Sequence, residues 1–309
     1  MEILKEIPKL KNKNCVSIGK FDGVHLGHVS LLEELVLNSE LNDMESCVFT
    51  FDPYPEDFFS KKDLLHLNTK GEIISEMEEI GVDRLIRAKF DEKLMNMSAR
   101  DFVKNILVGK LNAAVIVCGS DVSFGKGGEG DAALLLKLSE EFGFETQIID
   151  KIEYKGESIS SSRIIKALED GKTEDASEML GYDYYHYGKV IKGKGLARQF
   201  DMPTVNINPV PGRVIPRHGV YCTIVETSDH KEYKAVTNVG IRPTVDDGDN
   251  INIESHLLDC PSDRDFYEER INVYFLRFLR DEKRFDSNES LFTQIRSDII
   301  ETERFFEHK

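Results

Sequence analysis

The sequence predicts an α/β domain with a doubly wound parallel sheet, followed by a small antiparallel β-barrel domain that ends in a helix. Up to about residue 150, short apolar runs alternate with helical patterns, which implies a parallel sheet covered on both faces. Beyond Gly181 the pattern changes to alternating segments rich in β-branched and aromatic residues, as in a small barrel. A chain of 309 residues also exceeds one ordinary core. We therefore predict two domains, residues 1–182 and 183–309.

The first domain is predicted from apolar runs that alternate with amphipathic stretches. Strands are expected at residues 15–18, 47–51, 84–87, 114–118 and 147–149. Helices are expected at residues 26–37, 70–80, 98–107 and 131–142, and two shorter ones at 161–169 and 173–180. The third of these helices opens on Ser98 and Asp101, a spacing that resembles a capping box. Ligands of such sheets bind outside the carboxyl ends of the strands, at the switch point.

The second domain is predicted from alternating strands separated by turn residues. The strands are expected at residues 184–191, 219–226, 233–239, 251–258 and 271–279, and a helix at 289–306 ends the chain. The run of Asp, Gly and Asn at residues 246–250 is expected to be a loop.

Composition limits the classes of protein to which the chain can belong. A net charge of −16 argues against general nucleic-acid binding, which needs a basic surface. No apolar run approaches the roughly 18 residues of a membrane span, and the N-terminus lacks the pattern of a signal peptide. Five scattered cysteines favour reduced thiols in a reducing cytoplasm. The sequence leaves the oligomeric state open and is compatible with a monomer.

The most informative segment is G-K-F-D-G-V-H-L-G-H at residues 19–28, which lies between a predicted strand and a predicted helix. Backbone N–H groups and the helix dipole converge there, as in sites for phosphate. His25 and His28, three residues apart, share one face of the first helical turn. They are interpreted as donors to phosphate oxygens, as capping or half-buried side chains, or as two zinc ligands without a third nearby.

This segment resembles the signature of the adenylyltransferase module of bacterial FAD synthetases, within the wider H-x-G-H nucleotidylyltransferase superfamily. Three further segments are similar to motifs of that module in the same order. They are T-F-D-P-Y-P at residues 50–55, G-S-D-V-S-F-G at 119–125 and I-S-S-S at 159–162.

The second half resembles the riboflavin kinase module of the same bifunctional proteins. The matching segments are M-P-T-V-N at residues 202–206, G-V-Y at 219–221, N-V-G-I-R-P-T at 238–244, E-S-H-L-L-D at 254–259 and R-D-E-K-R-F at 280–285. The resemblance covers nearly the whole chain. It implies two reactions: riboflavin and ATP give FMN, and FMN and a second ATP give FAD and pyrophosphate.

For the kinase half, the resemblance assigns Thr204 and Asn206 to Mg²⁺ and the ATP phosphates, in keeping with the preference of magnesium for oxygen. Glu254 would be the base for the ribityl hydroxyl that attacks the γ-phosphate. From the residues alone, Glu254 also fits an outward carboxylate on an edge strand, and the Pro-Thr-x-Asn segment also fits a turn.

For the adenylyltransferase half, the resemblance makes His25 and His28 catalytic, because donors that stabilise the transition state are expected to carry this reaction. Asp121 is a candidate contact for the nucleotide or a metal, or a loop cap, and Phe51 and Phe124 fit either the core or a flavin contact. The nucleotide-binding residues expected in the two halves are Gly19, Phe21, Asp22, Gly23, Gly27, Asp121, Ser161, Ser162, Gly193 and Arg198.

Several positions depart from the family pattern. Ile165 stands where the family has an arginine that reaches the ATP phosphates, and Ala197 and Asp201 stand where glycines are expected. These departures leave two alternatives beside the bifunctional enzyme. One is a chain that retains a single activity, with the kinase better preserved. The other is a regulatory paralogue that binds flavin or nucleotide with little turnover.

Overall fold

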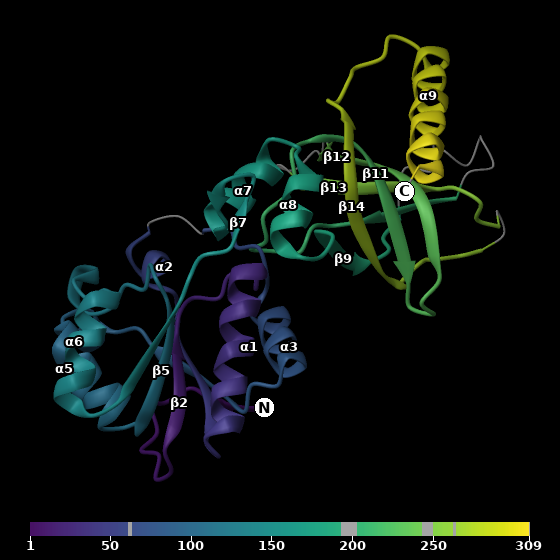
Figure 1. Cartoon of the computed structure of the whole chain (residues 1–309). Helices are drawn as coiled ribbons and strands as arrows, with labels where there is room; N and C mark the ends of the chain where they lie inside the picture. Colours follow the sequence, from purple (N-terminus) through teal and green to yellow (C-terminus); the bar gives the residue numbers. More distant parts are fainter. Residues whose placement is uncertain (61–63, 193–202, 243–249, 262–263, 309) are drawn as a thin grey trace. The chain divides into compact units, whose positions relative to one another are not determined.

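The computed structural model describes residues 1–60, 64–192, 203–242, 250–261 and 264–308. The chain divides into two compact units, Met1–Ser161 and Ser162–Lys309 (Figure 1). This division lies earlier in the chain than the domain boundary between residues 182 and 183, which stays a prediction.

The first unit is built on a six-stranded parallel sheet with the order β1-β4-β3-β2-β5-β6. Its strands are β1 (Glu2–Leu4), β2 (Asn14–Ile18), β3 (Glu45–Asp52), β4 (Arg84–Lys89), β5 (Ala113–Gly119) and β6 (Glu145–Ile149). The five predicted strands are confirmed, and β1, three residues long and mostly exposed, was missed. The chain passes from β2 to β3 on one side and returns to β5 on the other. The carboxyl end of β2 therefore lies at a switch point, where ligands of such sheets bind.

Helices cover both faces of this sheet, with α1 and α3 on one face and α5 and α6 on the other (Figure 1). The helices are α1 (Leu26–Leu41), α2 (Pro55–Phe59), α3 (Lys70–Ile80), α4 (Glu92–Met95), α5 (Ala99–Asp101) and α6 (Ala132–Phe142). A π-helical segment, Phe102–Val108, continues α5, and a 3₁₀ turn occupies Lys126–Gly128. The Ser98 half of the expected capping box is present, since Ser98 Oγ accepts from the Asp101 N–H at 3.1 Å, but the Asp101 carboxylate accepts from the Ser98 hydroxyl at 2.8 Å, where a capping box would have the Ser98 backbone N–H. Two apolar cores result, one on each face of the sheet.

The second unit is a curled antiparallel sheet with the order β10-β13-β12-β11-β14-β9. Its strands are β9 (Tyr185–Lys189), β10 (Thr204–Ile207), β11 (Gly219–Thr227), β12 (Glu232–Arg242), β13 (Asn250–Leu257) and β14 (Arg270–Arg280). A bridge from the Ile191 N–H to the Asn206 carbonyl at 2.8 Å joins the two edges into a half-barrel. The four-residue strand β10 was not predicted. A small hairpin, β7 (Glu153–Tyr154) and β8 (Glu157–Ser158), belongs to the first unit.

Three helices accompany the half-barrel: α7 (Ser161–Glu169), α8 (Thr173–Leu180) and α9 (Asn288–Glu307), close to the predicted ranges. Helix α9 packs against β11 and β12. A pair of hydrogen bonds ties it to β14, since Arg280 Nε and Nη2 donate to the Asp298 carboxylate at 2.9 and 2.7 Å. Asp298 is buried. Among the described residues, no helix combines the length and the apolar character needed to cross a membrane.

Removal of the Asp298 carboxylate is expected to loosen α9, because it leaves the guanidinium of Arg280 without its buried partner. We predict that Asp298→Ala lowers the free energy of unfolding by about 3 kcal/mol. The measurement is the urea midpoint of the full chain, together with hydrogen exchange of the α9 amides. Lys166→Ala is the matched control, because it breaks only the exposed Lys166–Asp170 pair and is expected to leave both readouts near wild type. Equal effects of the two variants would contradict this role of Asp298.

Candidate functional site

The turn between β2 and α1 follows a backbone path that side chains rarely allow. Phe21, Gly23 and Val24 have φ values of 59°, 88° and 34°, and such values are outliers for a β-branched residue like Val24. A Cβ on Gly23 would lie 2.6 Å from Leu67 Cδ1, so only glycine fits there. The turn therefore follows a tightly constrained backbone path at the carboxyl end of β2, where the first site was predicted.

The two histidines of the turn are stacked on each other. His25 is the N-cap of α1, and its Nδ1 accepts from the His28 N–H at 3.4 Å. The two imidazole rings are 3.7 Å apart between centroids and 15° from parallel. Gly27 leaves room for this stack, since a Cβ there would lie 3.2 Å from His25 Cε1. The motif therefore brings both predicted catalytic side chains to one place.

Burial keeps both imidazoles neutral at ordinary pH. It lowers the pKa of His25 to about 4, and the negative charges of Asp22 and Asp121 offset only part of this shift. Burial also lowers the pKa of His28 well below its usual value, with smaller contributions from His25 and Lys20. The buried His28 Nδ1 makes no hydrogen bond within the described part of the chain. A buried polar atom at the switch point is suited to a polar ligand.

Asp22 and Ser161 brace the turn from two sides. Asp22 Oδ1 accepts from the backbone N–H groups of Leu67 and Asn68 at 2.9 and 3.4 Å. Ser161 Oγ donates to the Asp22 carbonyl at 2.8 Å. Both residues were predicted to bind nucleotide, and in the structure these contacts hold the backbone of the turn. Ser162, the first residue of the second unit, is exposed.

Cations surround the turn, and each is paired with a carboxylate. Lys20 pairs with Glu56, and Lys151 pairs with Asp121 at 2.8 Å. Lys70 and Arg87 both pair with Asp52, at the end of β3. The exposed Lys20–Glu56 pair contributes little stability, so an anionic ligand can exchange for the Glu56 carboxylate at low cost. Sequence reasoning missed these cations, because no motif marks lysines that come from separate loops.

Phe124 and Phe51, the two aromatic residues whose role the sequence left open, belong to the apolar core of the first unit. Phe124 is buried in the apolar core beside α5, and Phe51 packs against the same core. Of the two interpretations left open for these residues, the structure supports the core.

The second predicted site is a polar face of the half-barrel. Strand register places Asn206 opposite Glu254, and Glu254 opposite Asn238, on three adjacent strands. Two residues away along the same two strands, Thr204 is opposite His256. Side chains directly opposite each other, and those two residues along a strand, share one face of a sheet. The predicted kinase residues therefore gather on one face of β10, β13 and β12.

Oxygen atoms on this face suit a magnesium ion. Thr204 Oγ1 is 2.9 Å from His256 Nδ1, and Asn206 Oδ1 accepts from Asn252 Nδ2 at 2.9 Å. Asn252 Oδ1 is buried and makes no hydrogen bond to any described residue. The described residues hold no cluster of three or more His, Cys, Asp or Glu side chains suited to a metal. Such a cluster is not needed for Mg²⁺, which takes few protein ligands and shares substrate phosphates.

Glu282 reaches the same face from beyond β14. Its Oε1 accepts from Asn238 Nδ2 at 3.3 Å, and a Cβ on Gly240 would overlap its carboxylate. His256 is also part of this face, and burial lowers its pKa. His256 was not among the predicted site residues. The alternation E-x-H at residues 254–256 could have identified it, because alternate residues of a strand share one face. Gly193 and Arg198, together with Ala197 and Asp201, lie outside the described residues.

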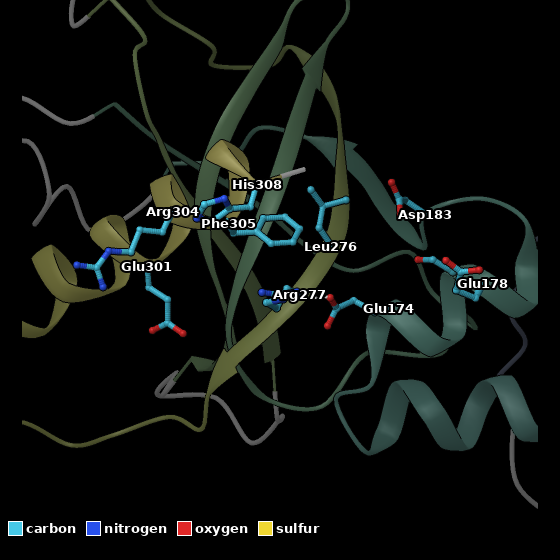
Figure 2. A pocket seen from close by; sticks show the side chains of 10 residues that line it. Glu174, Glu178, Asp183, Leu276, Arg277, Glu301, Arg304, Phe305 and His308 are labelled. Carbon is cyan, nitrogen blue, oxygen red and sulfur yellow. Dashed lines mark hydrogen bonds and ion pairs between the residues drawn. The ribbon is translucent and has the colours of Figure 1, made fainter. Parts of the chain in front are cut away.

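A groove of about 520 Å³ lies between α8, β14 and α9 in the second unit (Figure 2). Arg277 crosses it, donating to Glu174 Oε1 at 3.0 and 2.6 Å and stacking 4.5 Å from the Phe305 ring centroid. Leu276 and Arg304 also line it. None of the predicted site residues is among its lining residues, so the groove is separate from the polar face described above.

Comparisons with known proteins identify both halves. A family model described as FAD synthetase matches residues 7–163, and one described as riboflavin kinase matches residues 180–306. The bifunctional riboflavin kinase/FMN adenylyltransferase of Escherichia coli (strain K12) is 33% identical over 311 residues, covering 99% of this chain and 98% of the relative. The protein of the same name from Buchnera aphidicola (subsp. Schizaphis graminum) is 32% identical, covering 98% and 97%.

One solved structure matches over the same length. It is described as a macrolide-efflux protein from Streptococcus pneumoniae, has a TM-score of 0.86 and is 28% identical, covering 98% of this chain and 99% of that one. The agreement extends the match from sequence to fold.

The neutral state of His25 can be tested by titration. We predict that the NMR signal of the His25 ring titrates at about pH 4. Between about pH 6.5 and about pH 4 the unfolded chain binds a proton that the folded chain does not, so the free energy of unfolding falls as pH falls. His25→Asn is expected to flatten that part of the stability profile. A His25 signal that titrates near its ordinary pKa of about 6.5 would contradict the burial argument.

Proposed function

The chain belongs to the bifunctional riboflavin kinase/FMN adenylyltransferase family, and on this basis we propose that it phosphorylates riboflavin to FMN and then adenylylates FMN to FAD. The observation that supports both steps is the pair of separate polar sites, one in each unit. The first is a backbone turn with two stacked histidines, and the second is a face of side-chain oxygens around Glu254.

In the adenylyltransferase unit, we propose that the turn at residues 19–25 binds the phosphates of ATP through its backbone and the N-terminus of α1. The phosphate of FMN attacks the α-phosphorus, and pyrophosphate leaves. This nucleophile is already ionised at neutral pH, so no strong base is required. His25 and His28, held neutral and side by side, each offer one N–H to the charge that develops at phosphorus. Asp22 and Ser161 keep the turn in position.

In the kinase unit, Glu254 is proposed to accept the proton of the ribityl hydroxyl as that oxygen attacks the γ-phosphorus of ATP. Thr204 and Asn206, with the Asn252 amide oxygen beside them, would hold Mg²⁺. When bound, the ion neutralises charge on the phosphates. Asn238 and Glu282 border the same face, where they would fix the position of Glu254 and of the hydroxyl.

The remaining features support a cytoplasmic enzyme of small molecules. Cys15, Cys47, Cys118 and Cys222 are buried free thiols, as expected in a reducing compartment. The net charge of −16 argues against nucleic acid as a partner and leaves flavins and ATP possible, because a few local cations and a helix N-terminus suffice to bind phosphate. A monomer is sufficient for both proposed sites, because each is built within one unit of one chain.

The two activities can be measured in one experiment. Purified protein given riboflavin, ATP and Mg²⁺ is expected to release FMN first and FAD afterwards. The measurement is chromatography of the flavins over time. FMN that accumulates without FAD would indicate that the kinase activity alone is retained, as the replacement of the family arginine by Ile165 would suggest. Flavin binding without consumption of ATP would indicate a regulatory protein instead.

Substitutions in the two sites are expected to separate the activities. His28→Ala removes one donor to the transition state, so we predict a loss of about 10²–10³ in the kcat of FAD formation from FMN. Glu254→Gln removes the base, and we predict a loss of about 10²–10⁴ in the kcat of riboflavin phosphorylation. Each variant is expected to keep the other activity, which serves as its control for folding. Loss of both activities in either variant would contradict the assignment of separate sites.

A further inference from the structure

His66 lies between two carboxylates at the edge of the strained turn. Its Nδ1 is 3.4 Å from Asp22 Oδ2, and its Nε2 is 3.2 Å from Asp57 Oδ1. Asp22 belongs to the turn, whereas Asp57 belongs to α2, so the imidazole links two elements that are distant in sequence. The His66 side chain is 25% exposed, so protons reach it from solvent. No sequence motif marked this residue.

The geometry requires both ring nitrogens to carry hydrogen. An ionised carboxylate only accepts hydrogen bonds, and a neutral imidazole has a single N–H. A neutral ring would therefore leave one nitrogen lone pair facing a carboxylate oxygen. Only the imidazolium form satisfies Asp22 and Asp57 together, and it does so with charge-assisted hydrogen bonds.

The same segment holds the turn through its backbone. The residues that follow His66 donate their N–H groups to the other oxygen of Asp22, from Leu67 at 2.9 Å and from Asn68 at 3.4 Å. Leu67 also packs directly against Gly23, where no Cβ fits. Since Phe21, Gly23 and Val24 all have positive φ, the turn needs such contacts to keep its path.

We propose that His66, in its protonated form, is a positioning residue for adenylyl transfer: it locks Asp22 and thereby the turn that places His25 and His28. This inference rests on the proposed function of the first site. His66 touches no reacting atom in this account; its effect passes through the Asp22 carboxylate to the backbone between β2 and α1. Loss of its proton removes one of its two hydrogen bonds and loosens the turn.

The charges around His66 give the effect a direction with pH. Hydrogen bonding to Asp22 raises the pKa of His66, and the charges of Asp22 and Asp57 add to the shift against partial burial. The Tyr54 ring contacts it edge-on at 5.3 Å, and burial raises the pKa of this phenol, which keeps it neutral. Lys20 is the nearby cation that interacts with both Asp22 and Asp57. Adenylyl transfer is therefore expected to be supported below the pKa of His66 and lost as pH rises through it.

The test compares His66→Gln and His66→Arg in the full chain, with kcat/KM for FMN measured from about pH 6 to about pH 9. For the wild type we expect a fall at the alkaline end that approaches about ten-fold per pH unit. His66→Arg keeps a permanent charge and two donors, so it is expected to retain activity and lose the alkaline fall. His66→Gln is expected to be at least about ten-fold slower at low pH, with no alkaline fall.

Two controls distinguish this role from a general effect on folding. Riboflavin phosphorylation by the same preparations reports on the integrity of the chain. His230→Asn changes another histidine paired with a carboxylate, Glu226 at 2.9 Å, at an exposed position of the second unit. It is expected to leave the pH profile of FAD formation unchanged. Asparagine tolerates the positive φ of residue 230.

A measurement without substrates tests the same link. In the ligand-free protein, the NMR signal of the Leu67 amide is expected to titrate together with the His66 ring, and to stop doing so in both variants. An alkaline fall that persists in His66→Arg, a wild-type profile without any fall, or a Leu67 amide that does not respond would overturn the proposal. If the wild type makes no FAD at any pH, the proposed function fails, and the Leu67 titration still decides whether His66 controls the turn.

Discussion

The strained backbone between β2 and α1 is the constraint on which the first site depends. A chain that leaves a central strand and enters a helix within a few residues must turn sharply, and here Phe21, Gly23 and Val24 all take positive φ. Phe21 and Val24, which are not glycines, each cost about 1–3 kcal/mol in this conformation, and such residues persist only where their surroundings hold them. The Asp22 carboxylate, the Ser161 hydroxyl and the packing of Leu67 supply that support. As a result, the two stacked imidazoles of His25 and His28 lie at the N-terminus of α1.

The proposed sites of the two units are built from different parts of the chain. In the function proposed above, each of the two sites would receive the phosphates of ATP. In the first unit, the parallel sheet provides a switch point, and the site is built from backbone and from the end of a helix. In the second unit, antiparallel register aligns Asn206, Glu254 and Asn238 across three strands, so side chains build the site. A one-residue slip of β13 would turn Glu254 to the opposite face.

Much of the architecture was predictable, because its elements have strong local signals. Five of the six parallel strands of the first sheet were predicted from short apolar runs, and the burial of β2, β3 and β5 on both faces follows from the helices between the strands. Strands β1 and β10 were missed, since three or four residues carry too little periodicity to be recognised. Residues 98–107 were expected to form a regular helix, but most of this segment is π-helical. No pattern in the sequence indicated this difference.

The sequence by itself determined the fold class, the order of most elements and the motifs that contain His25, His28, Thr204, Asn206 and Glu254. These features depend on periodicity and on neighbours within a few residues. Only the tertiary structure decided what Asp22 does, which cations surround the turn, and that His66 lies between Asp22 and Asp57. Such contacts join residues from separate loops, and their distances depend on how the whole sheet packs. The physical reason is that a carboxylate in a loop has many possible partners until the fold brings one of them within hydrogen-bonding distance.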